Sequence, residues 1–483
     1  MMMNYKKVVV LAILILFSFK IMAQPNVHNQ STVYEWPKDS LVNNKLDKWQ
    51  DKKFGMIIHW GLYSVPGIIE SWSLCSESWI ERDSTVSYDN YKKWYWDLSK
   101  SFNPVKFNPD QWAQAAHDAG MRYVVFTTKH HDGFAMFDTK QTEFSIAQGP
   151  FKNNPRADVA KYVFDAFRKK DFMIGAYFSK PDWHSEYYWW SKYATPDRNN
   201  NYDINKFPWR WNKFKEYTYN QISELMHNYG SIDILWLDGG WVRPLESVND
   251  EVRSWGANIP SWSQNIDMKH IAEMARAAQP GLLMVDRTVH GPYENYQTPE
   301  QKIPSMKLDH PWESCMTLGD AWGFVQNDNY KSSFNVIHSL IEIVSKGGSL
   351  LLGVGPSSEG LIPDEAVKHL KKIGIWMNKN GEAIYNTRTV ADYHNGNVWF
   401  TQKKDGSKLF ALLCLNEGNV VPEYVEWSGN TPKKGSKMIL LETNRPVKWT
   451  LVNGKVRVIL PRGLSKELEA LAFSFMPVGK SVN

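Results

Sequence analysis

Short apolar runs alternate with amphipathic stretches through most of the chain, from about residue 50 to residue 385. The apolar runs are bounded by glycine or charged residues, as strands are, whereas the amphipathic stretches repeat their apolar positions at helical spacing. Strands that alternate with helices in this way predict a parallel sheet. The expected strands are residues 54–61, 123–133, 172–183, 232–241, 282–289 and 349–356, and the expected helices are residues 108–120, 158–171, 214–230, 267–281, 334–348 and 363–381.

The strand runs are apolar at nearly every position, as expected where helices cover both faces of a parallel sheet. About six strand–helix units are clear, and no glycine-rich phosphate turn follows the first strand. These features favour an α/β fold of the TIM-like (β/α) barrel type, regular or irregular, over a doubly wound dinucleotide-binding fold.

The pattern changes after about residue 386, where apolar and polar residues alternate in NVWFTQKKDGSKLFALLCLNE and KWTLVNGKVRVILP. The KDG and NG sequences inside these strings are typical of hairpin turns. The sequence therefore predicts a barrel domain over residues 24–385 and a C-terminal antiparallel β domain over residues 386–483.

The N-terminus has the pattern of a secretory signal peptide. Lys6 and Lys7 precede an apolar run at residues 8–19, and Ala23 offers a small residue at the cleavage point. The apolar run has about a dozen residues, too few to span a bilayer comfortably. We expect residues 1–23 to be removed, and the mature chain to be exported to the periplasm or the exterior with no membrane span.

Charge and cysteine content exclude some classes of function. Removal of residues 1–23 takes away three lysines and no acid, so the net charge falls from +5 to +2, which argues against nucleic-acid binding. Cys75, Cys315 and Cys414 are too few and too widely spaced for a disulfide framework or a zinc motif. The 23 tryptophans and 22 tyrosines suit either the stacking of a sugar or base or the filling of a large core.

Polar residues gather at the ends of the predicted strands, which is where barrel enzymes carry their chemistry. Each such group alone is more often structural than functional, but five strand ends that meet on one face favour a site. The groups are His59 and Trp60, Lys129 to Asp132, Tyr177 with Ser179, Lys180 and Asp182, Asp238 to Trp241, and Asp286 with Arg287.

Asp238 is the sharpest candidate, because it ends the apolar run IDILWL and precedes two glycines. A carboxylate at such a place is either a nucleophile or base, or a structural cap of the next loop. The loop at residues 290–304 offers Glu294 and Glu300 as acid partners. Two carboxylates across a glycosidic bond are the recurring machinery of glycoside hydrolysis.

Several strings together resemble the α-L-fucosidases of glycoside hydrolase family 29, over about residues 45–385 and in the family's order. The resemblance implies a barrel followed by a β-sandwich, and hydrolysis of fucosylated oligosaccharides or glycoconjugates with retention through a covalent fucosyl-enzyme. It also implies that no metal or other cofactor is needed. The strings are KFGMIIHWGLYSVPG, YVVFTTKHHDGFAMFD, IDILWLDGGW, NYQTPEQKIP, PWESCMTLGDAWGF and GGSLLLGVGPSSEGLIPDEA.

Matched by motif, the resemblance implies that Asp238 is the nucleophile and that Glu300, in the TPE string, is the acid/base, with Glu294 as the alternative. It implies further that the remaining motif residues bind the sugar, by hydrogen bonds to its hydroxyls or by packing on its ring and methyl group. The first kind are His59, His130, His131, Tyr177 and Arg287, and the second kind are Trp60, Trp322 and Trp79.

Three other interpretations stay open. The same fold and mechanism would serve a related sugar such as an α-L-galactoside, because an apolar pocket rejects an added hydroxyl only weakly. The chain could instead be a non-catalytic sugar-binding protein, which would need neither Asp238 nor Glu300. A barrel metallohydrolase would use His59, His130, His131, Asp132 and His184. The sequence carries no signal for an oligomeric state.

Overall fold

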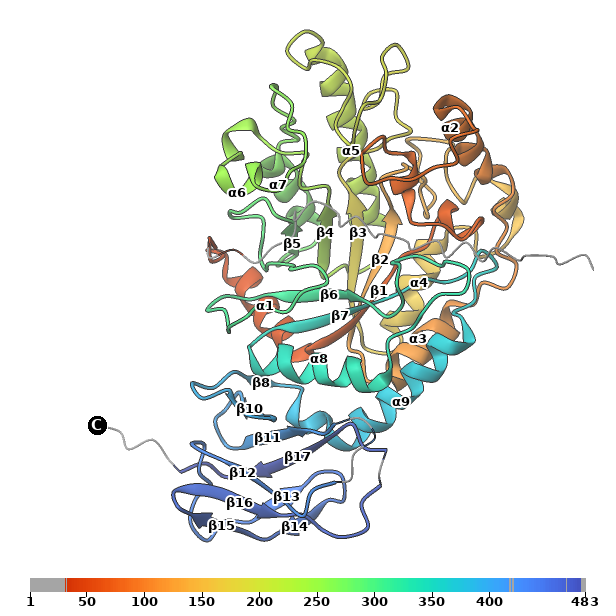
Figure 1. Cartoon of the computed structure of the whole chain (residues 1–483). Helices are drawn as coiled ribbons and strands as arrows, with labels where there is room; N and C mark the ends of the chain where they lie inside the picture. The colour runs from red at the N-terminus through yellow and green to blue at the C-terminus, as the bar shows by residue number, and fades with distance from the viewer. Residues whose placement is uncertain (1–30, 32, 417, 419–420, 466, 479–483) are drawn as a thin grey trace, which may run out of the picture.

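The computed structural model describes residues 31, 33–416, 418, 421–465 and 467–478, so the predicted signal peptide lies outside the described residues. Most of the described chain forms a parallel sheet with helices around it, and the C-terminal part forms antiparallel sheets beside it (Figure 1). No helix in the described ranges has the length and apolar character needed to cross a membrane.

The parallel sheet has seven strands in the order β5-β4-β3-β2-β1-β7-β6, and every neighbouring pair is parallel. The edge strands β5 and β6 are not paired with each other, so the predicted barrel is open. The strands are β1 (Phe54–Ile58), β2 (Tyr123–Lys129), β3 (Met173–Ser179), β4 (Ile234–Asp238), β5 (Leu283–Asp286), β6 (Glu313–Thr317) and β7 (Ser349–Val354).

The strand pattern predicted from sequence omits β6. Its sequence ESCMT begins with Glu313 and Ser314, so it has no apolar run that would mark a strand. Glu313 is nevertheless fully buried inside the curved sheet, where the Tyr123 hydroxyl and the Trp236 indole nitrogen both donate to it. Two donors compensate a buried carboxylate that the sequence pattern alone would place at the surface.

Most helices pack on the outer face of the parallel sheet, while the inner face holds a separate core that includes Val42, Leu46 and Trp49 of the first helix. Alternation along a strand produces this division: Tyr123 and Val125 belong to the inner core and Val124 and Phe126 to the outer one. The helices are α1 (Ser40–Lys52), α2 (Tyr88–Asp97), α3 (Pro109–Asp118), α4 (Val159–Arg168), α5 (Pro208–Asn228), α6 (Asp250–Arg253), α7 (Met268–Ala278), α8 (Ser333–Ser345) and α9 (Asp364–Asn380), with short 3-10 turns η1 (Leu62–Ser64), η2 (Ser71–Leu74), η3 (Leu98–Lys100), η4 (Pro150–Asn153), η5 (Leu245–Ser247) and η6 (Gly381–Ala383).

The C-terminal strands form two antiparallel sheets, with orders β14-β13-β17-β11-β10-β8 and β12-β16-β15, and β9 pairs with β10. Both sheets contribute to one apolar core, in which Phe400 and Phe473 of the first meet Trp427 of the second. Helix α8 separates these sheets from the parallel sheet (Figure 1). The strands are β8 (Thr387–Arg388), β9 (His394–Asn395), β10 (Val398–Lys403), β11 (Leu409–Cys414), β12 (Tyr424–Trp427), β13 (Met438–Leu440), β14 (Arg445–Val447), β15 (Trp449–Val452), β16 (Lys455–Ile459) and β17 (Ala470–Phe475).

Candidate active site

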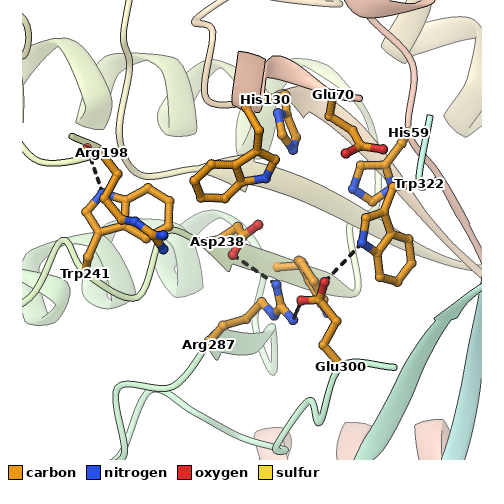
Figure 2. A pocket seen from close by; sticks show the side chains of 11 residues that line it. His59, Glu70, His130, Arg198, Asp238, Trp241, Arg287, Glu300 and Trp322 are labelled. Carbon is orange, nitrogen blue, oxygen red and sulfur yellow. Dashed lines mark hydrogen bonds and ion pairs between the residues drawn. The ribbon is translucent and has the colours of Figure 1, made fainter. Parts of the chain in front are cut away.

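A pocket lies at the carboxyl ends of the parallel strands and collects side chains from several of them (Figure 2). His59 follows β1, His130 follows β2, Asp238 ends β4 and Arg287 follows β5. Parallel strands place their carboxyl ends along one edge, and this brings distant parts of the sequence together. The other lining residues are Glu70, Trp72, Arg198, Trp236, Trp241, Glu300 and Trp322.

Asp238 is held in one orientation by three donors. The Tyr177 hydroxyl donates to Oδ2 at 2.7 Å, and Arg287 Nη1 and the Gly239 N–H donate to Oδ1 at 3.0 and 2.8 Å. Gly239 has a φ of +89°, and a Cβ there would lie 2.3 Å from the Pro181 side chain. Only glycine therefore fits at position 239. The tight turn that it forms leaves the Asp238 carboxylate directed into the pocket.

Glu300 is the second carboxylate of the pocket, and it shares a partner with Asp238. Arg287 Nη2 donates to Glu300 at 2.9 Å, and the Trp322 indole nitrogen donates to its other oxygen at 3.0 Å (Figure 2). One planar guanidinium thus spans both carboxylates. Burial opposes the charge of Arg287, but Asp238 and Glu300 raise its pKa above the usual value, so it stays a cation.

Glu294 lies elsewhere. It is buried, accepts the Thr288 N–H at 3.0 Å, and pairs with His290 Nδ1 at 2.6 Å. Burial alone would lower the pKa of His290, but its bonds to Glu294 and Glu251 raise it to about 9. The structure therefore places Glu300 in the pocket with Asp238 and engages Glu294 in an ion pair outside its lining.

The three motif histidines are buried and close together, but they differ in position. His59 and His130 line the pocket, while His131 lies behind it with its Nδ1 2.6 Å from the Ser179 hydroxyl. His130 Nδ1 bonds to the Ser71 hydroxyl. Burial lowers the pKa of His130 to about 4 and that of the other two well below the usual value. All three imidazoles are therefore neutral near pH 7, with one donor and one acceptor each.

The charged residues beside these histidines have structural partners. Lys129 pairs with Asp182 at 3.3 Å, and Asp132 accepts the Tyr95 hydroxyl at 2.8 Å. The chain bends directly after them at Gly133, whose φ is +81° and where a Cβ would lie 2.1 Å from Asp182. The bend turns His130 toward the pocket and leaves the buried charges paired behind it.

Two of the expected sugar-binding tryptophans are not at the pocket surface, and the prediction for them is corrected. Trp60 is 1% exposed, donates to the Ser357 carbonyl at 2.9 Å, and packs among core aromatic side chains. Trp79 lies behind Trp72, at 5.2 Å between ring centroids, and donates to Glu77 at 2.9 Å. Neighbouring residues in extended chain point to opposite sides, so His59 and Trp60 cannot both face the sugar.

Glu70 and Arg198 line the pocket, although no motif or pattern in the sequence points to either. Glu70 accepts the Gly323 N–H at 2.7 Å, and burial raises its pKa to about 7. Arg198 forms a bidentate pair with Glu77, and its guanidinium lies 5.1 Å from the Trp241 ring centroid. Both belong to irregular segments, where no periodic pattern marks which side chains face inward.

A group at the edge of the pocket could coordinate a metal ion, since donor atoms of His130, His131 and Asp238 lie within 4.8 Å of one another. The Arg287 guanidinium already occupies one oxygen of Asp238, and a metal ion there would meet its positive charge at close range. His184, another expected ligand, stacks on a phenylalanine ring away from this group. The donor set therefore fits a metal poorly.

Comparison with known proteins gives a consistent family. A family model described as Alpha-L-fucosidase matches residues 21–382. An Alpha-L-fucosidase of Branchiostoma floridae is 28% identical over 447 residues, which cover 89% of this chain and 92% of the relative. The Plasma alpha-L-fucosidase of Homo sapiens is 28% identical and covers 80% of this chain and 79% of the relative.

Solved structures share the fold. Alpha-L-fucosidase isoenzyme 1 from Paenibacillus thiaminolyticus superimposes with a TM-score of 0.72 at 28% identity, and covers 91% of this chain and 100% of that chain. An alpha-L-fucosidase GH29 from Bacteroides thetaiotaomicron, trapped as a covalent intermediate, has a TM-score of 0.70 at 22% identity and covers 94% and 99%. The second likeness concerns the fold alone.

Proposed function

Because the chain belongs to the alpha-L-fucosidase family, we propose that it removes terminal α-L-fucosyl groups from oligosaccharides or glycoconjugates with retention of configuration. The observation that carries the proposal is the arrangement of Asp238 and Glu300 on one guanidinium, that of Arg287. Retaining glycosidases hold two carboxyl groups about 5 Å apart. Two carboxylates that accept from the two terminal nitrogens of one guanidinium lie close together, as this mechanism requires.

In the proposed mechanism Asp238 attacks the anomeric carbon, while Glu300 protonates the departing glycosidic oxygen. Glu300 then removes a proton from the water that hydrolyses the fucosyl ester of Asp238. Tyr177 and Arg287 hold the nucleophile in line through their hydrogen bonds. Their hydrogen bonds also favour its charged form, which is the reactive one.

Sugar recognition falls to the other lining residues. The neutral rings of His59 and His130 can each donate to one hydroxyl and accept from another. Trp322 offers an apolar face to the sugar ring and its methyl group, while its indole nitrogen stays on Glu300. His131 lies behind these side chains, where it bonds to the Ser179 hydroxyl.

The pocket suits an enzyme that acts on chain ends. Its cavity volume is ≈ 30 Å³, which has room for water but not for a pyranose ring. The lining side chains must therefore separate to admit a pyranose ring, and they would then enclose it. Once opened, a pocket enclosed by side chains from several strand ends accepts one terminal unit and excludes the interior of a chain.

We also propose the finer organisation and location of the protein. The two C-terminal sheets with their common core are a β-sandwich, joined to the barrel domain between η6 and β8. Residues 1–23 act as a signal peptide, so that the mature enzyme works in the periplasm or outside the cell.

Hydrolysis of an aryl α-L-fucoside tests the function, with proton NMR to read the configuration of the first sugar released. We expect the α-anomer first, followed by mutarotation. The matching aryl α-L-galactoside should be a weaker substrate, since it differs by one hydroxyl at C6. Release of the β-anomer, or no hydrolysis of either glycoside, would refute the proposal.

A further inference from the structure

A second cavity, of ≈ 1070 Å³, forms a groove between α2 and the segment at residues 183–196. Its volume is at the upper end of the range of small-molecule binding sites, so it has room for more than one sugar unit. Six of its nineteen lining residues are aromatic, about twice the 14% share in the whole chain. They are Tyr88, Trp96, Trp183, Trp189, Trp190 and Tyr193.

This groove and the active-site pocket share a wall. Trp72 lines the pocket and Trp183 lines the groove, and their ring centroids are 5.5 Å apart. The carbonyl oxygen of Arg198 accepts from Trp183 Nε1 at 3.1 Å and from Trp241 Nε1, on the pocket side, at 3.0 Å. One backbone oxygen therefore holds a tryptophan of each cavity in place.

The groove has no excess of either charge, since three lysines and three acids line it. Lys92, one of them, also lies 4.4 Å from the Tyr88 ring centroid and reaches the Thr195 hydroxyl. Aromatic faces between hydroxyl, ammonium and carboxylate groups suit a polar ligand that has apolar faces but no net charge. A neutral sugar chain has this character. The charged lining residues are Lys92, Lys93, Lys192, Asp89, Asp97 and Glu186.

We propose that this groove binds the neutral sugar residues that lie beyond the fucosyl unit of an oligosaccharide substrate. The inference rests on the proposed function, because the pocket holds one terminal unit and the rest of the substrate must leave through its mouth. Trp72 of the pocket and Trp183 of the groove are in contact, so only these side chains separate the two cavities at this point. A chain that passes over these two side chains reaches the exposed Tyr193 ring, which packs against Trp190 at 5.3 Å between ring centroids.

Tyr193 is the residue to change, because it is 39% exposed and its removal should leave the fold intact. Loss of one stacking ring should lower kcat/KM for a fucosylated oligosaccharide of four or more neutral sugars about 3- to 10-fold in Tyr193→Ala. Hydrolysis of an aryl α-L-fucoside, which is too short to reach the groove, should be unchanged. Tyr193→Phe keeps the ring and should behave as wild type.

Trp94→Ala is the matched control. Trp94 is 42% exposed and lies on α2, which lines the groove, yet it is not among the lining residues. We expect it to leave both substrates unaffected. A neutral oligosaccharide without fucose should inhibit cleavage of the long substrate by wild type and should inhibit Tyr193→Ala more weakly.

Equal rates of wild type and Tyr193→Ala on the long substrate would overturn the inference, as would equal losses on both substrates. These results differ from failure of the proposed function, which would appear as an inactive wild type on the aryl fucoside. An effect in Trp94→Ala as large as in Tyr193→Ala would also overturn it, because the loss would then not depend on the groove.

Discussion

Replacement of Glu300 or Glu294 by alanine separates the acid/base from a structural carboxylate. Glu300 lies in the pocket with Arg287 and Trp322 as donors, and Glu294 lies outside the lining in its pair with His290. The two substitutions remove the same chemical group from places with different partners. Their effects should therefore differ in kind as well as in size.

For Glu300→Ala we expect the loss to depend on the leaving group. General acid catalysis contributes about 10²- to 10⁴-fold, so cleavage of a natural oligosaccharide should fall by this factor. An activated aryl group departs without a proton, so attack by Asp238 should persist. The fucosyl-enzyme should then accumulate as a burst, because the base that activates water is missing. The basic limb of the pH–rate profile should disappear.

For Glu294→Ala we expect loss of stability with little dependence on substrate. Breaking a buried pair costs up to about 3–5 kcal/mol, and the Thr288 N–H loses its acceptor as well. The folded pKa of His290 is raised to about 9 from 6.5, so its contribution to stability is complete below about pH 6.5 and is lost as the pH rises through 9. The stability difference between wild type and Glu294→Ala should shrink over that range.

Steady-state rates on both substrate types, with urea unfolding at pH 6.5 and pH 9.5, check these expectations. If Glu294→Ala showed the dependence on leaving group and Glu300→Ala only the loss of stability, the assignment of the two residues would be reversed. If both variants behaved alike, the argument from position in the pocket would be wrong.

Three further predictions follow from the same site and from the N-terminus. Asp238→Gly should lower aryl fucoside hydrolysis by on the order of 10³-fold or more, with partial recovery in azide as a β-fucosyl azide, and a rate near wild type would contradict its role. Lys180→Met should cost about 3–5 kcal/mol in denaturant unfolding, since it removes the ammonium group that pairs with the buried Asp286, and adding Asp286→Leu should restore part of the loss. N-terminal sequencing of native protein should find cleavage near Ala23–Gln24, and an intact Met1 would count against export.

The strand-end residues could be predicted from sequence, because their positions follow from register. Asp238 and Arg287 end or follow apolar runs, and parallel pairing brings such ends to one edge whatever their separation in the chain. The same logic failed at β6, where Glu313 is buried against two donors and interrupts the apolar pattern. A polar residue that finds its partners only in the folded state leaves no signal in the sequence.

Residues on irregular segments could not be placed in advance. Glu77 and Arg198 are 121 positions apart and form one ion pair, and no periodicity links the two loops that carry them. Trp60 shows the converse error, because the resemblance predicts that it faces the site together with its neighbour His59. Side-chain direction at the end of a strand depends on where the chain bends, which the string does not show.

The shared guanidinium suggests how one carboxyl group can be an acid in the first step and a base in the second. Before attack, the positive charge of Arg287 is divided between Asp238 and Glu300. Formation of the fucosyl ester removes the charge of Asp238, so the field of Arg287 then acts on Glu300 alone. A cation at hydrogen-bond distance favours the ionised form of a carboxyl group. In the proposed mechanism Glu300 has given its proton to the glycosidic oxygen in the first step, and the undivided charge of Arg287 then stabilises the carboxylate that the second step requires.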